Sequence, residues 1–206
     1  MRNSLTLFSA EDDIQSHRIR FLLAAKGIHY ECVVVKSHAL PEDLIDLNPY
    51  ASIPTLVERE LVLYNANVVS EYLDERYPHP SLMPADPLSR ARIRLTLLRI
   101  EQDWIPSIHA LKTGTKLQAD AAHKQLHALL TISAPLFRAS KFFLHSELSL
   151  ADCIMAPVLW RLKGLGVSLA DKERTAIEEY KKRLFNNPGF KRSLTEQEKS
   201  LYANTT

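Results

Sequence analysis

Hydrophobic and polar residues follow different periods in the first and second parts of the chain. Over the first 77 residues, short aliphatic runs predict strands, and a spacing of three to four residues predicts helices. The predicted strands are 4–8, 30–35, 55–58 and 61–64, and the predicted helices are 16–27, 41–49 and 66–77. Because a helix joins the first two strands, we expect them to be parallel with a right-handed crossover. This order predicts an α/β domain over residues 1–77.

The first predicted helix has residues typical of helix ends. Ser16 is a common N-cap residue, and Gly27 suits the left-handed conformation that often terminates a helix. Between them, Lys26 shares the helical spacing of Ile19 and Leu22 on one face. We therefore expect the helix to begin at Ser16 and to end at Gly27.

From Leu88 onward the pattern is helical and contains almost no strand signal. The predicted helices are 90–111, 119–138, 146–166 and 172–186. The first should be kinked at Pro106. The third is nearly all apolar and should be buried, and Ser149 with Asp152 forms a Ser-x-x-Asp capping box at its start. We expect an all-helical domain over residues 88–206, joined by a proline-rich linker at 78–87.

Composition places the chain among ordinary globular proteins. Apolar residues make up 46% and charged residues 24% of 206. No apolar run reaches the roughly 18 residues of a membrane-spanning helix, and the start lacks the apolar stretch of a signal peptide. We therefore expect a cytoplasmic protein with no membrane partner. Cys32 and Cys153 are expected to be two buried, reduced thiols.

The net charge of +2 conceals opposite charges on the two parts of the chain. Residues 1–86 carry 7 basic and 13 acidic side chains, a net charge of −6, whereas residues 87–206 carry a net charge of +8. The basic residues are spread over the second part without a dense run. The charge therefore gives no reason to expect direct, sequence-specific binding to DNA.

Several features together resemble the cytosolic glutathione transferase superfamily over essentially the whole chain. They are the strand–helix order, Ile53-Pro54 before a strand, the proline-rich linker and the Ser-x-x-Asp motif of the helical part. Within that superfamily, four segments resemble the bacterial stringent starvation protein A family. The segments are "LFSAEDDIQSHRIRFLLAAKG", "DLIDLNPYASIPTLVERELVLY", "EYLDERYPHPSLMP" and "LADCIMAPVLWRL". The resemblance implies a glutathione transferase fold, with a thioredoxin-like N-terminal domain and an all-helical C-terminal domain.

The resemblance also implies a role in transcription. Members of that family bind RNA polymerase holoenzyme, including its sigma factor, and alter transcription in starvation, stationary phase and acid stress. The implied functional surface is the Pro-His-Pro segment, whose prolines should hold it extended with its carbonyls exposed and limit the entropy lost on binding. Its neighbours are expected to add apolar contact area. The implied partner-binding residues are Tyr77, Pro78, His79, Pro80, Leu82 and Met83.

The groups that would hold glutathione are incomplete. Ile53-Pro54 resembles the cis-proline turn whose backbone pairs with glutathione, but such a turn also serves the fold itself. The Glu/Gln-Ser pair that binds the γ-glutamyl group corresponds to Asn65-Ala66. The loss of two or three hydrogen bonds to charged groups, each worth about 1.5–3 kcal/mol, predicts weak or absent glutathione binding. We therefore expect no cofactor.

A transferase also needs a group that activates the glutathione thiol near the end of the first strand. Ser9 and Ser16 are the only hydroxyls in that window, and Ser16 is better explained as a helix cap. Glu11, Asp12 and Asp13 crowd the same loop and would raise the pKa of a bound thiol. The window therefore argues against catalysis, and we expect no catalytic residue.

Two further candidates are better explained as helix surface. His123 and His127 have the i,i+4 spacing of metal ligands, but no third ligand is evident and we expect no metal site. Arg90, Arg92 and Arg94 form either a phosphate or partner patch or an ordinary charged helix face.

Three functions remain compatible with the sequence. They are an adaptor on RNA polymerase, a glutathione-dependent transferase with an unusual activator, and a non-catalytic dimer partner of a protein with the same fold. Asn65-Ala66 and the acidic loop favour the adaptor over the enzyme. The fold usually forms two-fold dimers, with the third helix and the long helix after it near the interface. Whether the chain pairs with itself or with a paralogue stays open.

Overall fold

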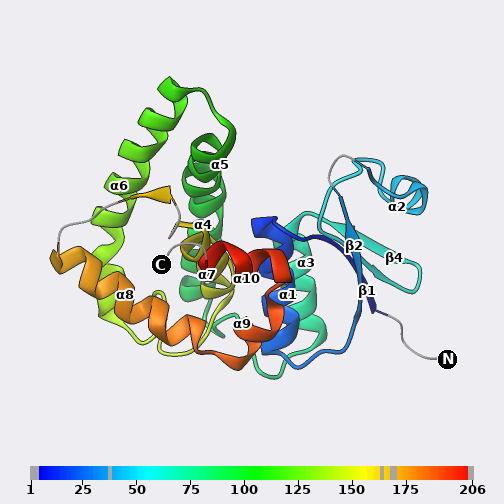
Figure 1. Ribbon diagram of the computed structural model, residues 1–206. Coiled ribbons are helices and arrows are strands. Elements are labelled where there is room, and N and C mark those ends of the chain that lie inside the picture. The colour runs from blue at the N-terminus through cyan, green and yellow to red at the C-terminus, as the bar shows by residue number, and fades with distance from the viewer. Residues whose placement is uncertain (1–4, 37–38, 163–164, 168–170, 204–206) are drawn as a thin grey trace. The chain divides into compact units, whose positions relative to one another are not determined.

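The four predicted strands form one mixed sheet in a computed structural model of the protein (Figure 1). The structure describes residues 5–36, 39–162, 165–167 and 171–203. The strands are β1 (Leu5–Ala10), β2 (Glu31–Val35), β3 (Thr55–Glu58) and β4 (Leu61–Tyr64). Their order is β2-β1-β3-β4, with β1 parallel to β2 and the other two pairs antiparallel. The predicted parallel pairing of the first two strands is confirmed.

The helices of this first unit pack on the sheet through apolar side chains. They are α1 (Ile14–Ala25), α2 (Glu42–Leu47) and α3 (Ala66–Arg76). Helix α1 completely buries Ile19 and Leu22, while Leu44 of α2 packs with Phe8 and Val35 of the sheet. The mixed sheet with its helices is the α/β arrangement that the sequence predicts.

Helix α1 begins earlier than expected because a different residue caps it. The Asp13 carboxylate accepts a hydrogen bond from the Ser16 backbone N–H at 2.6 Å, so Asp13 is the N-cap. The Ser16 hydroxyl instead accepts from the Ala10 backbone N–H at 3.1 Å. The prediction that Ser16 caps the helix is therefore wrong. Gly27 has φ +66° after the end of the helix, and its predicted left-handed conformation is confirmed.

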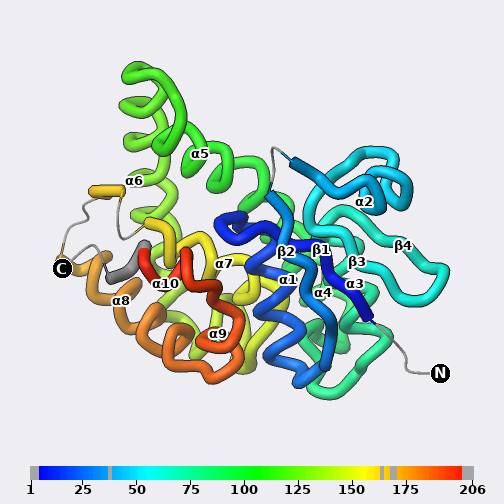
Figure 2. Tube along the Cα trace, turned by 45° about the vertical axis from the view of Figure 1, so that its right-hand side comes forward, coloured from blue at the N-terminus to red at the C-terminus, as the bar shows by residue number. Residues whose placement is uncertain are grey.

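A segment from near the C-terminus belongs to this first unit, which comprises Met1–Ser81 and Pro188–Ser200. Helix α9 (Pro188–Ser193) lies against α1 (Figure 2). The fully buried Phe190 stacks on the His17 ring, with ring centroids 5.1 Å apart. The sequence pattern predicts this segment to be part of the helical domain, because a six-residue helix is too short to indicate where it packs.

The second unit begins at Leu82 and, among its described residues, every named element is a helix. The helices are α4 (Pro87–Arg99), η1 (Ile100–Trp104), α5 (Ile105–Thr113), α6 (Lys116–Ala139), α7 (Leu150–Leu162) and α8 (Asp171–Phe185). Segment η1 is a π-helix just before Pro106, where the sequence predicts a kink. Proline lacks the N–H that would continue the α-helical ladder, and a π-helical turn accommodates the loss.

Helix α7 is the core of the second unit, as its apolar sequence predicts. All of its residues are buried, and Asp152 lies near its start. The Asp152 carboxylate accepts hydrogen bonds from the backbone N–H groups of Ser149 and Phe143, both at 2.8 Å, and from the Tyr180 hydroxyl at 2.6 Å. Burial raises the pKa of Asp152, and these donors partly oppose the shift. The predicted pairing of Asp152 with Ser149 is thereby confirmed.

Candidate functional site

The Pro-His-Pro segment follows directly after the end of α3. The Tyr77 backbone N–H donates to the Leu73 carbonyl at 3.1 Å and completes the last turn of the helix. Pro78, His79 and Pro80 are then exposed, whereas Tyr77 is half-buried. The peptide bond between His79 and Pro80 is cis. The segment is therefore a surface turn at a helix end and presents an imidazole between two proline rings.

The buried side chain of Lys26 holds the turn through hydrogen bonds to its backbone. The Lys26 Nζ donates to the Tyr77 carbonyl at 2.7 Å and to the Pro80 carbonyl at 2.6 Å. It also lies 2.7 Å from Oδ1 of Asp74, and the Lys26 side chain is 0% exposed. The Pro80 carbonyl, which was expected to be exposed, is thus occupied, and so is the carbonyl of Tyr77 just before the segment. The sequence signal for this contact was a lysine on the apolar face of a helix.

Tyr77 adds an aromatic ring to the turn, and its phenol stays protonated. The Arg76 guanidinium lies over the Tyr77 ring, 5.5 Å from its centroid. Burial raises the pKa of the Tyr77 phenol, and the Glu58 carboxylate adds to the rise, while Arg76 opposes it. The phenol therefore remains a neutral hydrogen-bonding group at physiological pH.

The structure does not place Leu82 and Met83 on this surface. Leu82 is 2% exposed and Met83 is 5% exposed, and both belong to the second unit. The Leu82 carbonyl accepts a hydrogen bond from the Leu150 backbone N–H at 2.9 Å, at the start of α7. The expectation that these two side chains offer exposed apolar area is wrong, because they are used in packing. The exposed site is limited to residues 77–80.

The cis-proline turn expected at a glutathione site is present, but the neighbouring Asn65 side chain stabilises the fold. The peptide bond between Ile53 and Pro54 is cis, as predicted. Asn65 has φ 76°, and its side-chain oxygen accepts from the backbone N–H groups of Asn67 at 3.0 Å and Val68 at 3.4 Å. Asn65 is therefore the N-cap of α3 rather than a group that reaches toward a ligand.

The two candidate thiol activators are buried and hydrogen-bonded. Ser9 is 1% exposed and accepts from Nη1 of Arg20 at 2.5 Å, while Ser16 is 0% exposed and accepts from the Ala10 backbone N–H. The acidic residue Asp13 caps the helix beside them. Both hydroxyls thus have structural partners, which gives them little capacity to activate a thiol.

Comparison with known proteins shows the family. The model of the glutathione S-transferase N-terminal domain matches residues 3–75, and the model of the C-terminal domain matches residues 85–188. The stringent starvation protein A homolog of Haemophilus influenzae is 47% identical, over 95% of this chain and 92% of that protein. The homolog of Coxiella burnetii is 42% identical, over 97% of this chain and 96% of that protein.

The chain belongs to the stringent starvation protein A family. Its fold is that of the glutathione transferases. Glutathione transferase Omega 3C from Trametes versicolor is similar to it with a TM-score of 0.84, covering 95% of this chain and 91% of that chain. At 21% sequence identity, that likeness concerns the fold alone.

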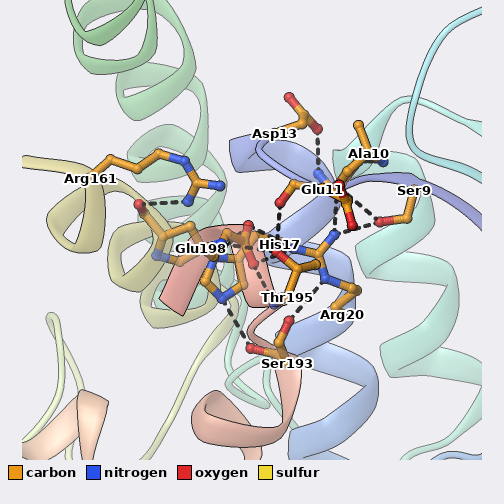
Figure 3. A network of polar contacts seen from close by, with 12 residues as sticks. Ser9, Ala10, Glu11, Asp13, His17, Arg20, Arg161, Ser193, Thr195 and Glu198 are labelled. Atoms are coloured by element: carbon orange, nitrogen blue, oxygen red, sulfur yellow. Dashed lines mark hydrogen bonds and ion pairs between the residues drawn. The ribbon is translucent and has the colours of Figure 1, made fainter. Parts of the chain in front are cut away.

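This member of the stringent starvation protein A family has a buried ionic cluster that the sequence analysis missed (Figure 3). Arg20 of α1 donates through Nη2 to the carboxylate of Glu198 on α10 (Glu196–Ala203) at 2.7 Å. His17 Nδ1 lies 3.3 Å from the same carboxylate, and His17 Nε2 lies 3.0 Å from the Ser193 hydroxyl. The cluster fastens the returning segment to α1.

A local sequence signal does exist for one half of this cluster. Thr195 and Glu198 form a Thr-x-x-Glu capping box. The Glu198 backbone N–H donates to the Thr195 hydroxyl at 3.1 Å, and the Thr195 N–H donates to the Glu198 carboxylate at 3.0 Å. The motif predicts a helix start, but it does not reveal that Arg20 supplies the counter-charge.

The remaining candidates occupy ordinary positions. His123 Nε2 lies 3.0 Å from the Gly166 carbonyl, and His127 is exposed on the same helix. Throughout the part of the chain that the structure describes, no group of three or more His, Cys, Asp or Glu side chains is placed to hold a metal ion. Arg92 and Arg94 are exposed on α4, and Arg90 is half-buried.

The two cysteines differ in exposure. Cys153 is buried in α7, as predicted, but Cys32 is exposed, so the prediction that it is buried is wrong. Cys32 lies on the edge strand β2, where Glu31 and Val34 are exposed as well. Separately, none of the described helices is both long and apolar enough to cross a membrane.

Proposed function

We propose that this protein is a non-catalytic regulator that docks on RNA polymerase holoenzyme, including its sigma factor, in the cytoplasm. In this proposal it alters transcription during starvation, stationary phase and acid stress. The observation that carries the proposal is the exposed turn Pro78–His79–Pro80, which a buried lysine holds at the end of α3. A stiff turn loses little conformational entropy on binding, so its exposed groups contribute more of their contact energy to affinity.

The chemistry of the turn suits a protein partner. The imidazole can donate or accept a hydrogen bond, and the flanking proline rings offer apolar contact. Tyr77 adds an aromatic edge with a hydroxyl, a residue type enriched at protein interfaces. No direct contact with specific DNA sequences is needed, because recognition of the promoter remains with the polymerase.

The alternative, a glutathione-dependent transferase, has less support from the same structure. Asn65 caps α3, and Ala66 offers no hydroxyl in place of the expected serine. Ser9 and Ser16 are buried, with hydrogen-bond partners. Calorimetry with glutathione should therefore detect at most weak binding, and a micromolar dissociation constant would favour the enzyme over the adaptor.

A two-fold dimer is part of the proposal, and each unit offers a suitable surface. In the first unit, Leu61, Leu63, Val68 and Tyr72 line an apolar groove between β4 and α3. In the second unit, three exposed leucines lie on α4. They are Leu88, Leu95 and Leu98. Pairing with a paralogue of the same fold would use the same surfaces.

The experiment is capture of RNA polymerase from cell lysate by the tagged protein. We expect the triple variant Pro78→Ala/His79→Ala/Pro80→Ala to keep its circular dichroism and melting temperature but to lose most of the captured polymerase. Residues at the centre of an interface typically contribute about 2 kcal/mol or more each. His127→Ala, which removes another exposed imidazole from α6, is the matched control and should capture polymerase like the parent. Equal capture by the folded triple variant would exclude the turn as the docking site and direct attention to Arg92 on α4.

A further inference from the structure

We propose that Lys26 is the positioning residue of the docking turn, supplying hydrogen bonds to its backbone that the two prolines cannot donate. The inference rests on the proposed function for its consequence, but the geometry itself concerns only residues 74–80 and the end of α1. Lys26 does not touch the partner in this proposal. It fixes the shape in which His79 is presented.

The turn has few backbone donors of its own. Pro78 and Pro80 have no N–H, so only Tyr77 and His79 can donate from the backbone of residues 77–80. The Tyr77 N–H is used in the last turn of α3, where it donates to the Leu73 carbonyl at 3.1 Å. The backbone of the turn therefore contributes little to fixing its own shape.

The ammonium group of Lys26 supplies the closure. It donates to the carbonyl of Tyr77, the first residue, at 2.7 Å and to that of Pro80, the last, at 2.6 Å. One charged donor thus links both ends of the turn. Hydrogen bonds from a charged donor are stronger than those between neutral groups, and these are shielded from water because the Lys26 side chain is 0% exposed.

Asp74 explains how the charge is tolerated in this buried position. Its Oδ1 lies 2.7 Å from the Lys26 Nζ, and its side chain is 6% exposed. The three protons of an ammonium group therefore have three acceptors, namely one carboxylate and two carbonyls. A buried cation needs such pairing, because an unpaired one carries a large desolvation cost.

The backbone of Lys26 is itself fixed. Its N–H donates to the Leu22 carbonyl at 3.0 Å, and Gly27, the next residue, takes the left-handed conformation with φ +66°. The side chain therefore extends from the rigid end of α1, and Asp74 extends from the last turn of α3. The turn is held by two helices of the first unit, so its shape is set before any partner binds.

The test separates the hydrogen bonds to the turn from the ion pair. The double variant Lys26→Met/Asp74→Asn removes the ammonium group without leaving a buried carboxylate unpaired. The matched control, Asp74→Asn alone, keeps the ammonium group, its two hydrogen bonds to the carbonyls and, in the amide oxygen, a third acceptor, so it tests the loss of the counter-charge alone. We expect the double variant to bind purified polymerase holoenzyme at least about tenfold more weakly than the parent. The control should bind within about threefold of the parent.

Backbone ¹⁵N relaxation provides a readout that does not depend on polymerase. In the parent and in Asp74→Asn, the order parameter of His79 should be near the rigid value of about 0.85, and in the double variant it should fall toward about 0.6. A folded double variant with an ordered His79 and parental affinity would overturn the role of Lys26, while the triple alanine variant tests the docking turn separately. If the triple variant binds normally, the proposed docking site fails and relaxation alone decides whether Lys26 holds the turn.

A chemical measurement on the parent covers the case in which the double variant does not fold. Acetic anhydride acetylates accessible lysine amines, and mass spectrometry locates the modified residues. Lys116 is exposed at the start of α6 and provides the reference rate. Lys26 should react at least about tenfold more slowly, because its amine is buried and hydrogen-bonded. Acetylation of Lys26 at the rate of Lys116 in the folded protein would contradict the proposal.

Discussion

Nη2 of Arg20 lies 2.7 Å from both carboxylate oxygens of Glu198, a residue 178 positions later in the chain. Glu198 is 0% exposed, and Arg20 is 4% exposed. The same arginine donates through Nε to the Ser193 carbonyl at 2.9 Å. One side chain of α1 therefore binds two points of the returning C-terminal segment. Removal of either charge would leave the other buried without its main partner.

We predict that Glu198→Ala lowers the free energy of unfolding by about 3–5 kcal/mol, the cost of breaking a buried ion pair from one side. Release of the returning segment should also make residues 188–200 sensitive to limited proteolysis. The matched control is Glu196→Ala. Glu196 is exposed and pairs with Lys199 at the surface, so the loss should stay below about 1 kcal/mol. Similar thermal and urea unfolding of the two variants would contradict the structural role of Glu198.

Asn65 has a positive φ and also caps α3. Two substitutions separate the effects of these two features on the free energy of unfolding. Asn65→Ala loses the cap and keeps a β-carbon at φ 76° without the polar side chain that helps Asn tolerate this conformation, so we expect a loss of roughly 2 kcal/mol. Asn65→Gly also loses the side chain but tolerates the positive φ, so its loss should be below about 1 kcal/mol. Urea unfolding measures both. Equal losses would show that the backbone conformation carries no strain.

Some features of this fold can be predicted from the sequence, and others cannot. The cis bond at Pro54, the left-handed Gly27 and the buried helix α7 were predictable, because each depends on a local motif or on periodicity. The start of α1 also has a local signal, but Asp13 and Ser16 are both capable caps, and only the surrounding structure decides between them. Local competition of this kind limits the prediction of helix boundaries.

Long-range packing accounts for the other differences. Nothing near Phe190 indicates that its ring stacks on His17, and nothing near Arg20 indicates that its counter-ion is Glu198. The same holds for the proposed docking turn, where the sequence indicated the exposed residues but not the lysine 50 or more positions earlier that binds the backbone of the turn. Contacts between distant residues leave little pattern in one sequence.

The two thiols should differ in reactivity. Cys32 is exposed and Cys153 is buried, so a chromogenic thiol reagent should titrate one thiol per chain in the native protein and two after unfolding. Although the Cys32 residue is exposed, its thiol is partly desolvated, which raises its pKa, while the Arg20 charge and a hydrogen bond with Ser9 partly oppose the rise. A raised pKa means less thiolate at any given pH, so Cys32 should react more slowly at pH 8 than free cysteine. Its rate should rise with pH through a midpoint above that of free cysteine.

Cys32→Ser should remove the native reaction completely and leave one thiol that appears only on unfolding. Cys153→Ser should keep the native reaction at the parental rate. Two rapidly reacting thiols in the native parent, or a Cys32 midpoint below that of free cysteine, would contradict these assignments.

The proposed dimer depends on apolar surfaces that both units leave exposed. On α4, Leu95 is 58% exposed and Leu98 is 45% exposed, one helical turn apart. On the first unit, Val68 is 51% exposed beside a groove that Glu71 and Glu75 also line. Leucines on a helix with exposed arginines complement an apolar groove with acidic residues, in keeping with the opposite net charges of the two parts of the chain.

We predict that the parent is a dimer at micromolar concentration and that Leu95→Glu/Leu98→Glu is a monomer. Each substitution would place a carboxylate in an apolar contact that also faces the acidic groove of the partner, so burial and like-charge repulsion act together. Light scattering over a range of concentrations measures the mass. The control is Leu117→Glu, because Leu117 is 80% exposed on α6 and lies outside both surfaces, so this variant should remain a dimer. A parent that is a monomer at ordinary salt, or a double glutamate variant that keeps the dimer mass, would show that α4 is not at the interface.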